Sequence, residues 1–392
     1  MRLVIGHSDD VDAADAMTEV VRQCTAQLDG DSPPIAGLLL AGIDYDHASL
    51  LKVLGDTWPD LPIIGGTTDG EFSSSGGYHD DSVALTLFCG SGVEAGFGVG
   101  KGLSEGVEAA VSSALSAASA GHEEPPVICL TIPESMTANC TEIVDALQHG
   151  LGPECPIFGG VSGDHREFGT TYQFAGGEVL TDSVPLLLFW GDLTVSYGVA
   201  SGWRPVGSTF KVTKAEGNVV YTIDDRPILE VFEEHWGDSY DWGVLGEFPL
   251  AVFPDPEDTD NFYLRAVFGI DSEQGTATFA ATVPEGATVR LAEVLRDGLL
   301  EGSSIAIDQA LKAFPGEAPG GGVVFSCAAR KWLLGSRVAE ESDLFDAALL
   351  GQGLPFVGWY AFGEIAPLTR GGRAFYHNET CIAVLFGSRS GN

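Results

Sequence analysis

Short apolar runs alternate along the chain with longer segments in which apolar residues recur at helical spacing. The short runs are bounded by Gly, Pro and polar residues, a pattern typical of buried strands. Strands that alternate in this way with amphipathic helices indicate an α/β fold. We therefore expect most of the chain to be built from α/β units.

One sequence pattern occurs three times, which predicts a repeated structural unit. Pro62–Thr68 (PIIGGTT) recurs as Pro156–Ser162 (PIFGGVS) and, more loosely, as Pro355–Tyr360 (PFVGWY). A polar, Gly-rich stretch and then an apolar strand follow each copy. These final strands are expected at 81–88, 182–189 and 379–386. Because Gly residues precede them, we expect each to form a hairpin with the strand before it and to make the sheets mixed.

The similarity extends upstream of each Pro, where a strand and a helix precede the copy, and a further strand and helix precede those. In the first unit we expect strands at 3–6 and 35–41 and helices at 11–28 and 47–57. The corresponding elements of the second unit are strands at 93–99 and 127–132 and helices at 104–120 and 138–149. In the third unit they are strands at 276–283 and 323–327 and helices at 301–314 and 340–350.

The predicted fold is therefore α/β, with repeated β-α-β-α-β-β units, mixed sheets and two domains. Residues 195–275 are additional to the units and include an acidic loop at Pro254–Asp258 that suits a linker. We place the domain boundary near 195–205. The first predicted domain, 1–200, holds two units, and the second, 201–392, holds the third unit and the insertion.

The charge of the chain is strongly one-sided, with 56 acidic residues against 19 basic ones and a net charge of -37. Nucleic acids and anionic membranes both bind positively charged surfaces, so neither is an expected partner. Few of the basic residues are Lys. An acid-rich, Lys-poor surface indicates adaptation to a salty cytoplasm, where ions screen self-repulsion; an ordinary acidic cytosolic protein is the alternative.

The cysteines and the apolar runs argue against several further classes of protein. Seven Cys residues are spread along the chain without a CxxC pair, which argues against a disulfide framework and a structural zinc site. The first ten residues lack the apolar region of a signal peptide, and no apolar run reaches the ~18 residues of a membrane span. We therefore expect a soluble, cytoplasmic protein.

The repeated motifs resemble those of the FIST family, the F-box and intracellular signal transduction proteins. The N-terminal part is similar in Ile64–Glu71 and in the strand that follows. The C-terminal part is similar in Phe325–Cys327, Arg330, Glu340, Gly358, Gly363-Glu364, His377-Asn378 and Thr380. The resemblance covers nearly the whole chain. It implies a sensor of a small ligand, such as an amino acid or a derivative, which signals to a separate histidine kinase, cyclase or chemoreceptor.

Arg330 and Glu364 are the first candidates for contacts with a charged ligand. Arg330 follows the strand that ends at Cys327, and ligands of open α/β sheets bind beyond the carboxyl ends of strands. Its guanidinium could hold a carboxylate of the ligand, or could pair internally with Glu340 or Glu341. Glu364 follows aromatic residues that include Tyr360, a setting that suits an ammonium group.

The Glu364 carboxyl could instead have a structural role. Glu71 holds the comparable place in the first unit, so in both units the acid could accept hydrogen bonds from backbone amides of the Gly-rich turn. Asn378 and Thr380 open the last strand and could orient a polar ligand. A turn in which the Asn side chain bonds its own backbone is the alternative for Asn378.

His377 and Cys327 support two further hypotheses. Haem-binding relatives in the family imply His377 as an axial ligand in a nitric-oxide or other gas sensor, although His79 has the same place in the first unit. Apart from this haem alternative, no cofactor or metal is expected. Cys327 could be a nucleophile with His377 as its base, or a packed apolar residue. The sequence has no Gly-x-Ser-x-Gly elbow, Walker loop or HExxH motif, so an enzyme is the least favoured class.

Overall fold

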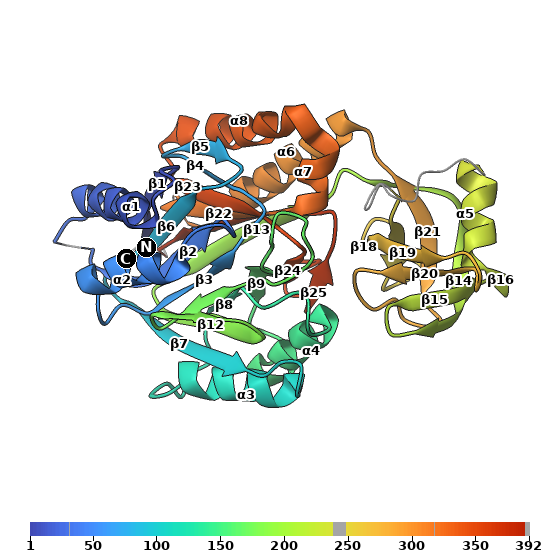
Figure 1. Cartoon of the computed structure of the whole chain (residues 1–392), viewed down its shortest axis with the longest axis horizontal. Coiled ribbons are helices and arrows are strands. Elements are labelled where there is room, and N and C mark those ends of the chain that lie inside the picture. The colour runs from blue at the N-terminus through green and yellow to red at the C-terminus, as the bar shows by residue number, and fades with distance from the viewer. Residues whose placement is uncertain (31, 238–247, 317, 389–392) are drawn as a thin grey trace.

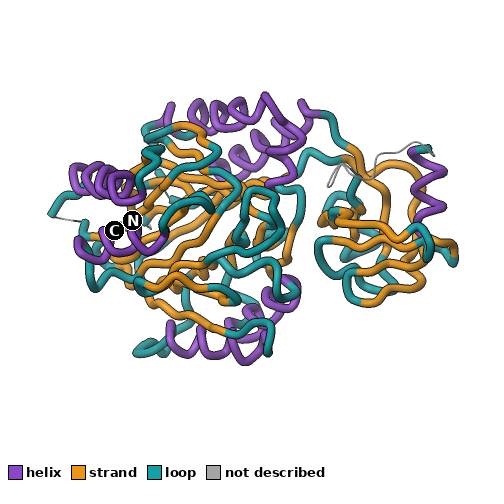
Figure 2. Tube along the Cα trace, in the orientation of Figure 1, coloured by secondary structure: helices purple, strands orange, loops and turns teal. Residues whose placement is uncertain are grey.

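The computed structural model describes residues 1–30, 32–237, 248–316 and 318–388 (Figure 1). It consists of a large body with three mixed sheets and a smaller β-rich lobe. The strands of the body lie inside and its helices lie outside (Figure 2). The N-terminus and Ser388, the last described residue, lie close together on the body, on the side away from the lobe, and the Met1 ammonium donates to the Ser388 hydroxyl.

The three sheets of the body follow one strand order. The first is β1 (Arg2–Ser8), β6 (Val83–Cys89), β2 (Pro34–Ala41), β3 (Ile63–Thr67), β10 (Gln173–Ala175) and β11 (Glu178–Leu180). The second is β7 (Val93–Lys101), β12 (Ser183–Gly191), β8 (Ile128–Thr131), β9 (Ile157–Gly160), β24 (Glu364–Pro367) and β25 (Ala374–His377). The third is β13 (Thr194–Ala200), β26 (Cys381–Gly387), β22 (Gly321–Cys327), β23 (Phe356–Ala361), β4 (Glu71–Ser73) and β5 (Gly77–His79).

Each sheet receives a hairpin from a different unit. Hairpin β4–β5 of the first unit pairs with β23 of the third, and β24–β25 of the third pairs with β9 of the second. Hairpin β10–β11 of the second unit pairs with β3 of the first, which closes the cycle. The turn of β10–β11 is Gly176-Gly177, with φ of 56° and 82°. Two central residues with positive φ suit a tight hairpin turn, and glycine adopts them without strain.

The final strand of each unit takes a different place from the predicted one. We expected it to form a hairpin with the strand before it, but β6 lies between β1 and β2 and is antiparallel to both. The expectation was wrong because the polar stretch between the two strands forms a hairpin of its own, and this hairpin pairs with a strand of a neighbouring sheet. The parallel pairing of β2 with β3 still makes the sheets mixed.

The predicted position of the first strand of the third unit was also wrong. We expected it at 276–283, but β13 pairs with β26 at the edge of the third sheet and fills that place. The predicted segment contains β20 (Thr276–Phe279), which belongs to the lobe. The long insertion after β13 separates this strand from the rest of its unit, so sequence proximity pointed to the wrong strand.

The helices cover the outer faces of the sheets. They are α1 (Ala13–Gln27) and α2 (His47–Thr57) on the first sheet, α3 (Val107–Ala118) and α4 (Cys140–Leu151) on the second, and α6 (Arg296–Ala313), α7 (Ala328–Leu334) and α8 (Val338–Ala348) on the third. Short 3-10 turns at Gly335–Arg337 and Leu350–Gln352 flank α8. The carboxylate of Asp12 caps α1 by accepting from the amides of Ala14 and Asp15.

The inner faces of the sheets meet in one core. Phe88, Phe189 and Phe386 lie near the ends of the three equivalent apolar strands, and the ring of Phe88 lies 5.2 Å from Phe189 and 5.5 Å from Phe386. All three side chains are fully buried. Burial of such large apolar surfaces is the main favourable term in folding, so the repeated Phe holds the three units together.

The lobe is inserted into the third unit between β13 and α6. Its sheet contains β14 (Arg204–Glu216), β15 (Val219–Ile223), β16 (Arg226–Pro227), β17 (Leu250–Phe253), β18 (Tyr263–Arg265), β19 (Val267–Asp271), β20 and β21 (Thr288–Glu293). Helix α5 (Ile228–Trp236) packs on this sheet. Strands β14 and β21 pair next to the connections to the body, so the chain enters and leaves the lobe at one place.

Candidate functional site

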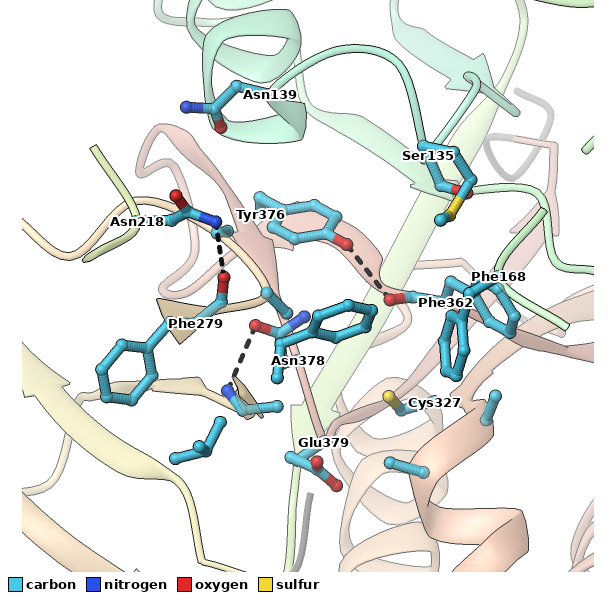
Figure 3. Close-up of a pocket in the computed structure, with 18 of the residues that line it drawn as sticks. Ser135, Asn139, Phe168, Asn218, Phe279, Cys327, Phe362, Tyr376, Asn378 and Glu379 are labelled. Atoms are coloured by element: carbon cyan, nitrogen blue, oxygen red, sulfur yellow. Dashed lines mark hydrogen bonds between the residues drawn. The ribbon is translucent and has the colours of Figure 1, made fainter. Parts of the chain in front are cut away.

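A cavity of about 360 Å³ lies at the junction of the body and the lobe (Figure 3). The body contributes the loop after β8, the start of α7 and the segment between β25 and β26, and the lobe contributes residues of β19 and β20. The aromatic residues in its wall are Phe168, Phe268, Phe279, Trp332, Phe362 and Tyr376. Its size and its mainly apolar wall are typical of a site for a small ligand.

Glu379 is the acidic residue in the wall of this cavity. Its side chain is fully buried, and neither carboxyl oxygen has a hydrogen-bond partner within the described parts of the chain. Its backbone has φ of 61°, in the left-handed region. Burial, and then the neighbouring Glu364, raise the pKa of Glu379 well above its usual value. An unpaired buried carboxyl is costly, and one that lines a cavity is a candidate ligand contact.

The second unit provides a comparison for Glu379. Asp182 has the equivalent place before the last strand and a similar φ of 49°. Its carboxylate accepts hydrogen bonds from the Ser104 amide at 2.8 Å, the Ser104 hydroxyl at 2.7 Å and the Thr137 hydroxyl at 2.7 Å. The second and third units thus share this backbone conformation, whereas between these two residues only Glu379 has an unsatisfied carboxyl.

Glu364 lies behind the cavity wall rather than in it. Its Oε2 accepts hydrogen bonds from the Thr380 hydroxyl at 2.6 Å and the Thr380 amide at 3.2 Å. Burial raises the pKa of Glu364 to about 8. The same geometry occurs in the first unit, where Glu71 accepts from Ser82 and Thr68, and burial raises the pKa of Glu71 to about 8. The contacts of Glu364 within the chain are thus similar to those of Glu71 in the first unit.

Two of the predicted site residues do line the cavity, Cys327 and Asn378. The Oδ1 atom of Asn378 accepts from the amide of Ala266 in the lobe at 3.4 Å. Burial and the carboxyls of Glu364 and Glu379 raise the pKa of the Cys327 thiol well above its usual value. A thiol that keeps its proton is a poor nucleophile, so this environment does not favour the cysteine-enzyme hypothesis.

Arg330 and Tyr360 belong to a different buried network. The guanidinium of Arg330 donates to Glu341 Oε1 at 2.6 Å, Leu299 O at 2.8 Å and Ser326 Oγ at 3.1 Å. It also donates to Ser201 O at the entry to the lobe, and the Tyr360 hydroxyl donates to Glu341 Oε2 at 2.7 Å. The carboxylate beside Arg330 is thus one of the chain's own, as the internal-pair alternative expected. Neither Arg330 nor Tyr360 lines the cavity.

His377 and Thr380 line a second cavity of about 350 Å³, which also borders Arg204, Asp260 and Glu301. The His377 ring is fully buried, and its Nε2 donates to Ala366 O at 3.0 Å. Burial lowers the pKa of His377 to about 4. Axial ligation of haem needs an apolar pocket, and these charged neighbours do not provide one. The residues around His377 therefore do not fit haem.

The described residues contain no group of three or more His, Cys, Asp or Glu side chains placed to hold a metal ion. In the same part of the chain, no helix is both long and apolar enough to cross a membrane.

Glu379 is the site residue that sequence reasoning missed. Its signal was its position directly before the last strand, which Asp81 and Asp182 share in the other units. Asp81 is exposed and Asp182 is hydrogen-bonded, so the pattern alone indicated a turn. Burial without a partner is a property of the tertiary structure.

Curated relatives match almost the entire chain. An uncharacterized protein of Mycobacterium tuberculosis is 27% identical over 402 residues, which cover 98% of this chain and 100% of the relative. An uncharacterized protein of Mycobacterium bovis is 26% identical over 395 residues, covering 98% of this chain and 99% of the relative. A shorter match, 34% identical over 93 residues, covers 24% of this chain and 18% of an uncharacterized protein of Methanocaldococcus jannaschii.

Among solved structures, a cyanuric acid hydrolase from A. caulinodans aligns over 100% of this chain and 99% of its own, with 7% identity and a TM-score of 0.35. That similarity is too low to bear on function. The family models are specific: the FIST N domain matches residues 35–226, and the FIST C domain matches residues 229–367. Together they span most of the chain, which therefore belongs to the FIST family.

Proposed function

We propose that this protein senses a small ligand that binds in the cavity between the body and the lobe, and that it signals to a separate effector. FIST domains are associated with small-ligand sensing in signal transduction. The observation that carries the proposal is the buried, unpartnered carboxyl of Glu379 in the wall of that cavity. A cytoplasmic location is part of the proposal, as is an effector such as a histidine kinase, a cyclase or a chemoreceptor.

The position of the cavity supports a mechanism for signalling. Three hydrogen bonds join the body to the lobe beside it: Arg265 Nη1 to Tyr376 O at 2.8 Å, Asn139 Nδ2 to Thr282 Oγ1 at 2.8 Å, and the Ala266 amide to Asn378 Oδ1 at 3.4 Å. A ligand in the cavity contacts both partners of this junction. Its binding energy would then favour one position of the lobe over another, which an effector can read.

The connection between body and lobe is also coupled to the rigid interior. Arg330 donates to Ser201 O, which lies between β13 and the first strand of the lobe. The Arg330–Glu341 pair therefore fixes one end of the connection to α7 and α8. In this proposal Arg330 acts by positioning the lobe.

Ligand binding to the cavity can be tested by thermal shift and calorimetry with a panel of small amines, amino acids and dipeptides. The variant Ala280→Phe places a ring in the cavity wall and should abolish binding. The matched control, Glu273→Gln, changes an exposed residue of the lobe and should bind like the parent. A ligand that binds equally well to Ala280→Phe would place the site elsewhere and contradict the proposal.

A further inference from the structure

We infer that the ligand of this cavity is a small organic cation, an amine or an alkylated ammonium, without a carboxylate group. This inference rests on the proposed function and narrows it. It differs from the amino-acid ligand that the family resemblance implies, because an amino acid carries a carboxylate as well as an ammonium group. Three features of the cavity support it: the charge of its wall, its aromatic rings and the contrast among the three units.

The charge of the wall favours a cation. Glu379 contributes an acidic group, and no Lys or Arg belongs to the wall as far as the structure describes it. Cations near the wall have partners within the chain. Arg330 pairs with Glu341 at 2.6 Å, the Lys331 ammonium lies 2.8 Å from Asp80, and the Arg265 guanidinium donates to the carbonyls of Thr282, Leu264 and Tyr376. A carboxylate in this cavity would be buried without a cationic partner, which costs several kcal/mol for an ion in a medium of low dielectric constant.

Aromatic rings surround the same space. The ring of Phe168 lies 5.0 Å from Phe268 of the lobe, 5.3 Å from Phe362 and 6.0 Å from Trp332. The guanidinium of Arg166 lies over the Trp332 ring at 4.7 Å, so this cluster already holds one cation by its π face. Aromatic walls together with a carboxylate are the surroundings in which proteins bind alkylated ammonium groups.

The three units show that the unpaired acid is not required by the fold. At the position before the last strand, Asp182 has its carboxylate hydrogen-bonded by the chain, and Asp81 is exposed to water. Glu379 is both fully buried and without a partner. Its environment is therefore completed by something outside the chain, and the missing partner of a carboxylate is a cation or a hydrogen-bond donor.

The size of the cavity limits the ligand. A volume of about 360 Å³ lies near the lower end of ligand sites in proteins, so we expect a molecule of the size of choline or 3-methylbutylamine. The Asn378 side chain lies next to Glu379 in the wall and could contact a polar group at the other end of the ligand (Figure 3).

The test compares probes that differ in one charge. 3-Methylbutylamine is leucine without its carboxylate, and 3,3-dimethylbutanol is the uncharged counterpart of choline. Calorimetry should show that the amine binds more than about tenfold tighter than leucine, because leucine would bury a carboxylate without a cationic partner. Choline should bind more than about tenfold tighter than the alcohol, because the alcohol lacks the positive charge that pairs with Glu379.

Glu379→Gln removes the ionisable carboxyl, and so the charge it can carry, with almost no change in shape. In this variant the affinity for both cations should fall at least about tenfold, while any weak affinity for 3,3-dimethylbutanol stays the same. Glu273→Gln again serves as the matched exposed control. Circular dichroism of the Glu379→Gln variant checks that it is folded; because this change removes a buried acid, we expect its stability to be at least that of the parent.

Two results would overturn the inference in distinguishable ways. If leucine binds as tightly as 3-methylbutylamine, or if Glu379→Gln leaves the affinity for choline unchanged, the ligand is not a cation held by Glu379, but the cavity remains a ligand site. If no amine, amino acid, dipeptide or neutral probe binds to the parent, both this inference and the proposed function fail.

Discussion

Glu364 and Gln173 occupy equivalent places in two of the three units. Each begins the first strand of a hairpin, and each accepts a hydrogen bond from the hydroxyl that precedes or opens the last strand of its unit, from Thr380 at 2.6 Å and from Ser183 at 3.0 Å. The amide of Gln173 carries no charge. The second unit thus shows that a neutral side chain meets the structural need at this position.

The variant Glu364→Gln should therefore be more stable than the parent at alkaline pH. The folded-state pKa of Glu364 is raised to about 8, so between its ordinary pKa and pH 8 the folded protein holds a proton that the unfolded chain has lost. Stability that this proton provides is complete at acidic pH and declines as the pH rises toward 8. We expect Glu364→Gln to gain on the order of 1–3 kcal/mol at pH 8 relative to pH 5.

Urea unfolding of parent and variant at a series of pH values measures this difference. Glu71→Gln should behave in the same way, since burial raises the pKa of Glu71 to about 8 in the same setting. A parent protein whose stability does not decline between about pH 5 and pH 8 would contradict the assignment.

Cation binding should become tighter as the pH rises. In the free protein, burial and then the neighbouring Glu364 raise the pKa of Glu379 well above its usual value, which favours the protonated carboxyl. A cation binds the ionised form, and binding therefore releases the proton. Choline has no proton that titrates, so its affinity should increase as the pH rises and Glu379 ionises more readily.

Calorimetry of choline binding in two buffers of different ionisation enthalpy counts the released protons directly. Glu379→Gln removes the group that titrates and should lose both the pH dependence and the proton release. Proton release of the same size in that variant would assign the effect to another residue.

Arg330→Ala should destabilise the protein without removing a ligand contact. The change leaves Glu341 buried without its guanidinium partner, a loss of about 3–5 kcal/mol in other proteins. Arg337 is a matched control, because its ion pairs with Glu340 and Asp297 are partly exposed to water and its removal should have little effect. Unfolding curves of the two variants give the comparison. A well-folded Arg330→Ala protein of normal stability would contradict the structural role of the Arg330–Glu341 pair.

Salt should stabilise the folded protein. With a net charge of -37, the acidic side chains of the folded protein repel one another. Salt screens this repulsion, because the Debye length falls from about 10 Å at 0.1 M salt to about 3 Å at 1 M. Melting temperatures measured over this range should rise with NaCl. Neutralising the exposed loop residues Glu123 and Glu124 to Gln should reduce the slope slightly; a melting temperature that falls with NaCl would contradict the high-salt interpretation.

The local elements could be predicted from the sequence, because apolar periodicity acts over a few residues. The expected helix at 47–57 corresponds to His47–Thr57, and the expected strand at 35–41 corresponds to Pro34–Ala41. The equivalence of Glu71 and Glu364 also follows from the repeat, and the hydrogen bonds to Ser82 and Thr380 confirm it.

Long-range pairing could not be predicted in the same way. The partner of hairpin β4–β5 is β23, almost 300 residues away in the sequence. The two-residue periodicity of a strand shows which side chains are buried, but it does not identify the strand with which it pairs. The site depended on this assembly: whether Arg330 meets a ligand or Glu341, and whether Glu379 is buried or exposed, is decided by which segments pack over the strand ends. Only Cys327 and Asn378 of the predicted residues line the cavity.

The exchange of hairpins makes the three units of the body mutually dependent. A fragment that ends at residue 200 lacks β24 and β25, which complete the second sheet, and the remaining fragment lacks β4 and β5, which complete the third. Removal of the lobe, by contrast, leaves all three sheets with every strand. The lobe is thus the part of the molecule that can change in length and sequence without loss of the fold of the body. Under the proposed function, such variation would change which ligand binds while the structure of the body stays the same.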